Sequence, residues 1–121
     1  MKVLKPTIFP TLPLVLKKMY EAIMKGVKKQ KFLTKSFFYS AVKFKARNLR
    51  KKAKFISPFY DKYTFKKIRE KLGGSIRLII TGGAQNSEKV MEFFKIAFST
   101  NLCEIYGQTE SSGASFMTKP F

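Results

Sequence analysis

Apolar residues recur at helical spacing in the first third of the chain. In the stretch "TLPLVLKKMYEAIMKGVKKQ" they stand four positions apart, at Val15, Met19, Ile23 and Val27. Side chains at this spacing share one face of an α-helix. The stretch therefore predicts an amphipathic helix over residues 12–28.

Two more helices follow in the pattern. "TKSFFYSAVKFKARNLRKKAK" has looser helical spacing and is followed by Ser57 and Pro58, which we expect to stop it because proline disfavours a helical residue before it. "DKYTFKKIREKLGG" predicts a short helix with Gly73 just past its C-terminus, where glycine tolerates a left-handed backbone. Thr11 and Thr34 are the expected N-caps of the first two helices.

The pattern changes after the glycine pair at 73–74. "SIRLIIT" and "LCEIY" are short and apolar and predict strands, and "SEKVMEFFKIAFS" between them predicts a helix capped by Ser87. Strand, helix and strand with short links form a βαβ crossover, in which the strands lie parallel. The sequence therefore predicts an α/β fold, with a mainly helical part over residues 1–73 and a βαβ unit over residues 75–121.

Positive charge divides the chain at nearly the same place. The 121 residues include 25 Lys or Arg and seven Asp or Glu, a net charge of +18. Residues 1–77 hold 22 of the basic and three of the acidic residues, a net +19, whereas residues 78–121 carry a net −1. We therefore expect the basic helices and the βαβ unit to have different roles.

Composition excludes several kinds of site. With no histidine in the sequence, a Ser-His-Asp triad, a Cys-His pair and most zinc sites cannot form within this chain. Cys103 is the single cysteine, so it forms no intramolecular disulfide, and we expect it to be buried. The sequence has no apolar run of about 18 residues for a transmembrane helix. Its first residues also lack the pattern of a signal peptide.

Two polar loops leave the predicted parallel strands. "TGGAQNS" follows the first strand and "GQTESSG" follows the second. Ligands of parallel sheets bind beyond the carboxyl ends of the strands, so both loops are expected along one rim. Gly82 and Gly83 lack Cβ atoms and let the backbone approach a flat or charged ligand, although such a pair is also typical of a simple turn.

The second loop carries groups that suit a nucleotide. Tyr106 has an aromatic face on which a base can stack, and Gly107 permits a tight turn. Thr109 offers a hydroxyl to a phosphate oxygen, and Glu110 is a hard oxygen ligand of the kind that Mg²⁺ prefers. Packing of Tyr106 at the sheet end and solvent exposure of Glu110 are the alternatives that these residues leave open.

Several motifs resemble those of a known enzyme family. "RLIITGGAQNS" followed by "IYGQTESSGAS" resembles the adenylate-forming, AMP-binding family, whose members carry a strand ending in Gly-Gly-Ala and a later Tyr-Gly-x-Thr-Glu. "LKPTIFPTLPLVLKKMYEAI" and "YTFKKIREKLGGSIRLIITGGA" resemble its long-chain fatty acyl-CoA synthetase branch. The resemblance implies that residues 1–121 are part of an AMP-binding domain, a fragment of the large adenylate-forming N-terminal domain.

The resemblance also implies which residues hold the nucleotide. Residues 82–84 would lie along the adenine, Tyr106 would cover its ring, Thr109 would contact the α-phosphate, and Glu110 would bind Mg²⁺. Thr109 and Glu110 are thus the implied catalytic residues. The full implied nucleotide-binding set is Gly82, Gly83, Ala84, Tyr106, Gly107 and Thr109.

The implied reaction is the activation of a long-chain fatty acid, a step of lipid metabolism. A fatty carboxylate attacks the α-phosphate of ATP and releases pyrophosphate, and the thiol of coenzyme A then displaces AMP, with Mg²⁺ as the implied metal. Gln85 and Asn86 stand where the family often has proline and leucine, so the loop departs from the family pattern there. The family's Ser/Thr/Gly-rich phosphate loop and lysine-bearing C-terminal domain have no counterpart in this sequence, so we expect the fragment alone to be inactive.

The basic helices leave other functions open. A net charge of +19 suits an anionic membrane surface or a nucleic acid, and a non-catalytic module for either partner is the alternative to an enzyme fragment. The sequence has no recognisable nucleic-acid-binding motif, and a solvated charged face is a further alternative. We expect an intracellular protein, with peripheral contact to the endoplasmic reticulum or another organelle membrane as one option.

Overall fold

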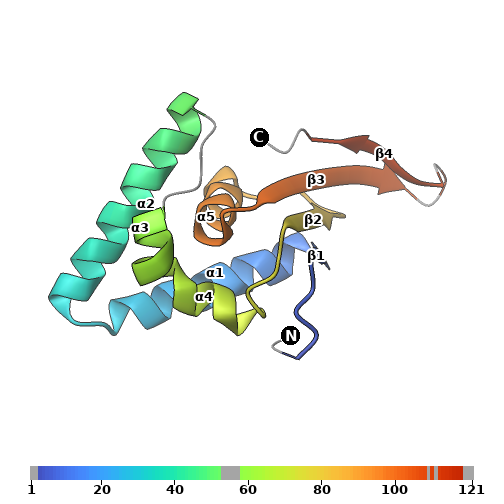
Figure 1. Ribbon diagram of the computed structural model, residues 1–121. Coiled ribbons are helices and arrows are strands. Elements are labelled where there is room, and N and C mark those ends of the chain that lie inside the picture. The colour runs from blue at the N-terminus through green and yellow to red at the C-terminus, as the bar shows by residue number, and fades with distance from the viewer. Residues whose placement is uncertain (1–2, 53–57, 109, 111, 119–121) are drawn as a thin grey trace.

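The chain folds into a group of helices beside a small mixed sheet (Figure 1). The computed structural model describes residues 3–52, 58–108, 110 and 112–118. The elements in chain order are β1 (Ile8–Thr11), α1 (Pro13–Lys28), α2 (Phe32–Lys52), α3 (Pro58–Tyr60), a π-helical segment η1 (Asp61–Phe65), α4 (Lys66–Lys71), β2 (Leu78–Gly82), α5 (Glu88–Phe98), β3 (Asn101–Gln108) and β4 (Gly113–Met117).

The sheet has the strand order β1-β2-β3-β4. β2 and β3 pair in parallel and are joined through α5, which confirms the predicted βαβ unit. Two strands were not predicted. β1 adds a parallel edge strand beside β2, where Pro10 is tolerated because an edge strand can spare a backbone N–H. β4 adds an antiparallel strand beside β3.

The expected N-caps at Thr11 and Thr34 are wrong. Thr11 lies in β1, paired with Thr81, so α1 begins two residues later with Leu12 as its N-cap and Pro13 in its first turn. α2 already begins at Phe32, which leaves Thr34 inside the helix. Ser87 does occupy the N-cap position of α5, although its side chain makes no capping hydrogen bond.

The predicted short helix before the sheet is longer and less regular than expected. Helical backbone starts at Pro58, passes through η1 and continues into α4, so Pro58 begins this helix. The expected residue past its end is confirmed: Gly73 has a φ of 94°, and the N–H groups of Gly73 and Gly74 donate to the carbonyls of Glu70 and Arg69. This paired closure satisfies carbonyls that the helix end leaves without partners.

α5 lies at the centre of the hydrophobic core. It contacts α1, α2, α4, η1 and β3, and Figure 1 shows it between α2 and the sheet. Phe9, Ile79 and Leu102 lie in register across the three parallel strands and are buried in the same core. Cys103 is buried beside Leu102, as predicted. The residues that α5 buries are Val90, Phe93, Phe94, Ile96, Ala97 and Phe98.

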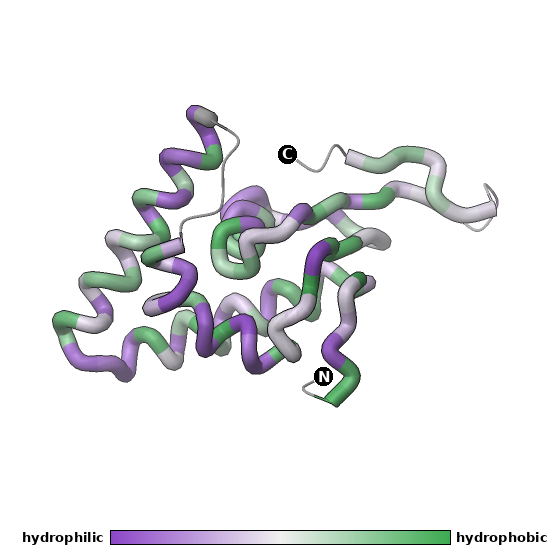
Figure 2. Tube along the Cα trace, in the orientation of Figure 1, coloured by the Kyte–Doolittle hydropathy of each residue, from purple (hydrophilic) through white to green (hydrophobic). Residues whose placement is uncertain are grey.

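α2 is far more polar than α5, and Figure 2 shows hydrophilic and hydrophobic positions alternating along its whole length. It is nevertheless held to the core by Lys45, whose side chain is only 1% exposed. Lys45 Nζ pairs with Asp61 and donates to the Ile96 carbonyl at 2.8 Å and to Ser99 Oγ at 2.9 Å. Arg69 donates to the same aspartate and to Ser99 Oγ. The network thereby joins α2, η1 and α4 to the C-terminal end of α5.

Burial lowers the pKa of Lys45, while the hydrogen bond and charge of Asp61 oppose that shift. Two cations share one aspartate here. The carbonyl end of the α5 dipole, to which both basic side chains donate, offsets part of the excess positive charge.

Replacing Lys45 tests whether this network holds α2 in place. Lys45→Met fills similar volume but removes three hydrogen bonds, so we expect the free energy of unfolding to fall by about 1–3 kcal/mol. Lys43→Met, an exposed change on the same helix, should alter it by less than about 0.5 kcal/mol. Urea unfolding followed by circular dichroism measures both, and equal effects would contradict the assigned role of Lys45.

Candidate functional site

A pocket of about 600 Å³ opens at the carboxyl ends of β2 and β3. Parallel pairing brings the two strand ends together, with Thr81 opposite Glu104 and Gly82 opposite Ile105. The predicted parallel pairing of the two strands is therefore confirmed, but β3 continues to Gln108, three residues past the partner of Gly82, so the turn of the second predicted loop lies farther along β3. The pocket is lined by Gly83, Ala84, Gln85, Glu104, Ile105, Tyr106, Gly107, Phe116, Met117 and Thr118.

Gly82 and Gly83 are required for different physical reasons. A Cβ on Gly82 would lie 2.6 Å from the carbonyl oxygen of Ile105, closer than backbone atoms tolerate. Gly83 has a φ of 90°, a conformation that side chains rarely permit. Gly82 therefore allows close strand packing, and Gly83 turns the chain into the pocket wall together with Ala84.

Tyr106 and Gly107 lie in β3, which is longer than predicted. The side chain of Tyr106 is 60% exposed, and its ring centroid lies 6.4 Å from that of Phe116 on β4. A Cβ on Gly107 would collide with the backbone carbonyl of Gly113, at a point where the pairing of β3 and β4 shifts register. The predicted loop after Tyr106 is thus partly strand, because β4 supplies backbone partners as far as Gln108.

The two implied catalytic residues lie past the end of β3. Thr109 falls outside the residues that the structure describes. Glu110 is exposed in the connection from β3 to β4 and lies outside the lining of the pocket. Within the described part of the chain, no three His, Cys, Asp or Glu side chains gather closely enough to hold a metal ion.

Sequence reasoning missed two side chains that shape the pocket. One carboxylate oxygen of Glu104 accepts hydrogen bonds from the backbone N and the side-chain Nδ2 of Asn86, both at 2.9 Å. Asn86 Nδ2 also lies 3.3 Å from Thr81 Oγ1. The one available signal was a carboxylate inside an otherwise apolar strand, a position that charged side chains occupy only when paired.

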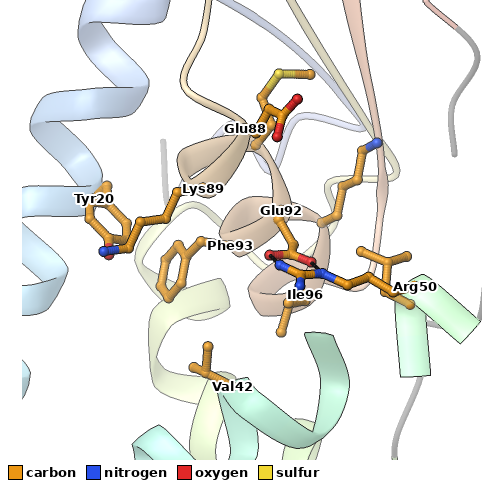
Figure 3. Close-up of a pocket in the computed structure, with 11 residues that line it drawn as sticks. Tyr20, Val42, Arg50, Glu88, Lys89, Glu92, Phe93 and Ile96 are labelled. Atoms are coloured by element: carbon orange, nitrogen blue, oxygen red, sulfur yellow. Dashed lines mark hydrogen bonds and ion pairs between the residues drawn. The ribbon is translucent and has the colours of Figure 1, made fainter. Parts of the chain in front are cut away.

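A second, larger hollow of about 840 Å³ lies between α1, α2 and α5 (Figure 3). Its apolar wall includes Tyr20 and Phe93, whose rings pack edge to face with their centroids 5.0 Å apart. The guanidinium of Arg50 faces the carboxylate of Glu92, with hydrogen bonds of 2.8 and 3.0 Å. This ion pair raises the pKa of Arg50. The Arg50–Glu92 ion pair lies in the lining of this hollow, and its polar groups already bond to each other. The pocket beside β2 and β3 is therefore the better candidate for a ligand site.

Known proteins match this chain from end to end. The family described as "AMP-binding enzyme" matches residues 1–121. The chain is 35% identical over 119 residues to "Long chain acyl-CoA synthetase 3" of Arabidopsis thaliana and 38% identical over 120 residues to "Long-chain-fatty-acid--CoA ligase 5" of Rattus norvegicus. These alignments cover 97% and 99% of this chain but 18% and 17% of the relatives. No solved structure matches the chain significantly.

The matches bear on the alternatives left open by the sequence. They favour a segment of an adenylate-forming enzyme over a free-standing basic module for membranes or nucleic acid. The chain spans less than a fifth of the length of these relatives.

Gly82 and Gly26 form a matched pair for testing the rim. Gly82→Ala forces a methyl group against the Ile105 carbonyl, so we expect a loss of about 1–3 kcal/mol in the free energy of unfolding. Gly26→Ala in α1, where a Cβ meets no atom within 4 Å, should instead add about 0.5–1 kcal/mol. Urea unfolding of both variants is the measurement, and a neutral Gly82→Ala would refute the close approach of β2 and β3.

Proposed function

This chain belongs to the AMP-binding enzyme family, and from that premise we propose that it is a segment of a long-chain fatty acid–CoA ligase. In the complete enzyme, a fatty carboxylate would attack the α-phosphate of ATP to form an acyl-adenylate with release of pyrophosphate, and the thiol of coenzyme A would then take the acyl group with release of AMP. Relatives named as long-chain acyl-CoA synthetases and ligases support this substrate class. Because the chain covers so little of their length, the activity is assigned to the whole protein.

The rim pocket is the observation that carries the proposal. Its wall combines glycine backbone at Gly83, the exposed ring of Tyr106 and the apolar side chains of Phe116 and Met117. A flat, largely apolar base fits between such surfaces, and a volume of about 600 Å³ lies within the usual range for small-ligand pockets. In this assignment, Gly82, Gly83 and Ala84 run along the adenine and Tyr106 covers its ring.

Phosphate and metal contacts are assigned to the connection from β3 to β4. Mg²⁺ is commonly held by one or two carboxylates together with substrate phosphates and water. Glu110 is exposed and supplies one such carboxylate, so its chemistry fits a metal carried in by the nucleotide. Bound there, Mg²⁺ would offset negative charge on the phosphates. Thr109, from the same motif, is assigned to the α-phosphate.

The role of Glu110 is tested by exchange of labelled pyrophosphate into ATP in the complete protein that carries this chain. Exchange should require a long-chain fatty acid, and Glu110→Gln should slow it by about 100-fold or more, because the metal loses an anionic ligand. Glu21→Gln, an exposed glutamate of α1, is the matched control and should leave exchange unchanged. Undiminished exchange in Glu110→Gln would remove this residue from the mechanism.

We also propose that the basic helices contact an anionic membrane peripherally, which would place the protein on an intracellular membrane such as the endoplasmic reticulum. Among the described residues, no helix is long and apolar enough to cross a bilayer. Phe37, Phe59 and Tyr63 form an exposed aromatic surface. The ring centroid of Phe59 lies 6.2 Å from that of Phe37 and 5.2 Å from that of Tyr63. Lys62 lies over the Tyr63 ring at 5.7 Å. Exposed aromatic rings beside lysines suit the interface of an anionic bilayer.

Vesicle sedimentation tests this contact. The protein should bind vesicles that contain phosphatidylserine, bind neutral phosphatidylcholine vesicles less, and lose the difference as salt screens the lysines. Phe59→Ser should weaken binding, whereas Phe32→Ser, the same change at a more exposed phenylalanine outside the aromatic surface, should not. Binding that is indifferent to both lipid charge and salt would refute an electrostatic contact.

A further inference from the structure

Glu104 occupies an unusual position between the two halves of the rim pocket. It lies in β3, flanked by β2 and β4 in the sheet (Figure 1), and it lines the pocket beside Gly83 and Tyr106. Its backbone is fixed by Thr118, because its N–H donates to Thr118 Oγ1 at 2.8 Å and its carbonyl accepts from Thr118 N at 2.9 Å. The backbone from which the Glu104 carboxylate extends is thus hydrogen-bonded to Thr118 on one side and paired with Thr81 of β2 on the other.

That carboxylate reaches across the rim to the loop that follows β2. One oxygen accepts two hydrogen bonds from Asn86, one from the backbone and one from the side chain. Asn86 in turn lies within hydrogen-bond distance of Thr81, a residue only 1% exposed at the end of β2. The loop that contains Gly83 and Ala84 is thus fastened between Thr81 at its start and Asn86 near its end.

We propose that Glu104 is a positioning residue for nucleotide binding, acting through Asn86 on the loop formed by residues 83–86. A glycine-containing loop has many accessible conformations, and ordering it when a ligand binds costs conformational entropy. A hydrogen bond to a carboxylate is about twice as strong as one between neutral groups. The Glu104–Asn86 contact orders the loop in advance, so the base meets a preformed wall. This inference rests on the proposed nucleotide site and specifies how that site is held.

The test compares Glu104→Ala, Glu104→Gln and Glu88→Ala in the complete protein, with AMP as the probe. Glu104→Ala removes the oxygen that accepts both hydrogen bonds from Asn86, and we expect AMP to bind about tenfold more weakly and the KM for ATP to rise about as much, with little change in kcat. Glu104→Gln keeps one acceptor oxygen and should lose about threefold or less. Glu88→Ala removes the same charge from the exposed first turn of α5 and should change neither value.

Reciprocal substitutions at positions 86 and 104 distinguish loss of the hydrogen bond from misfolding. Asn86→Asp sets two carboxylates against each other and should weaken AMP binding at least as much as Glu104→Ala. Adding Glu104→Gln to Asn86→Asp restores an amide–carboxylate pair in reverse and should recover most of the affinity. Such recovery supports the positioning role, because a merely destabilising pair of changes would lower affinity further.

The outcomes separate this inference from the proposed function. If the unaltered protein binds AMP and every Glu104 variant binds it equally well, the positioning role is overturned and the nucleotide site stands. If the unaltered protein binds no AMP, both are overturned. If AMP binds and the variants behave as expected but no fatty acid supports exchange, the positioning role is supported and the substrate assignment fails.

Discussion

The parallel pairing of β2 and β3 across α5 is the constraint on which the structure depends. α5 buries six of its residues. The chain enters α5 from β2 and leaves it into β3, which lies next to β2 in the sheet. Parallel strands run in the same direction, so the loop after β2 meets β3 next to Ile105, where the pairing of the two strands ends. Gly82 permits this approach, since any side chain there would meet the Ile105 backbone. Core packing and pocket geometry therefore have a common cause.

The pocket at this edge is built mainly from backbone, aromatic surface and one internal carboxylate. Gly83 and Ala84 form one wall, β3 and β4 form the other, and Glu104 connects the two through Asn86. Such a wall presents little charge of its own, which suits the base of a nucleotide better than its phosphates. The acidic Glu110 lies farther along the chain, in the exposed connection from β3 to β4 and outside the lining of the pocket.

The basic helices pack against α5. The residues that line the pocket include none of their lysines or arginines. Most of the net charge of +19 over residues 1–77 is exposed to solvent. Among the basic residues whose burial the structure describes, Lys45 alone is fully buried, and it pairs with Asp61. With Arg69 and Ser99 it anchors the helices to the end of α5. A few buried polar groups therefore hold the helices in place, while most of the described lysines stay exposed to solvent.

Periodicity and turn chemistry in the sequence determined α1, α5, β2, β3 and the parallel order of the two strands. These features follow from local spacing, such as Val15 to Val27 at every fourth position, and from the topology that a βαβ unit imposes. Tertiary structure decided the rest. β1 and β4 are short or exposed strands whose residues become strands only because β2 and β3 offer them backbone partners. The Glu104–Asn86 contact joins positions 18 apart, and no local pattern encodes which side chain a carboxylate will meet across a sheet.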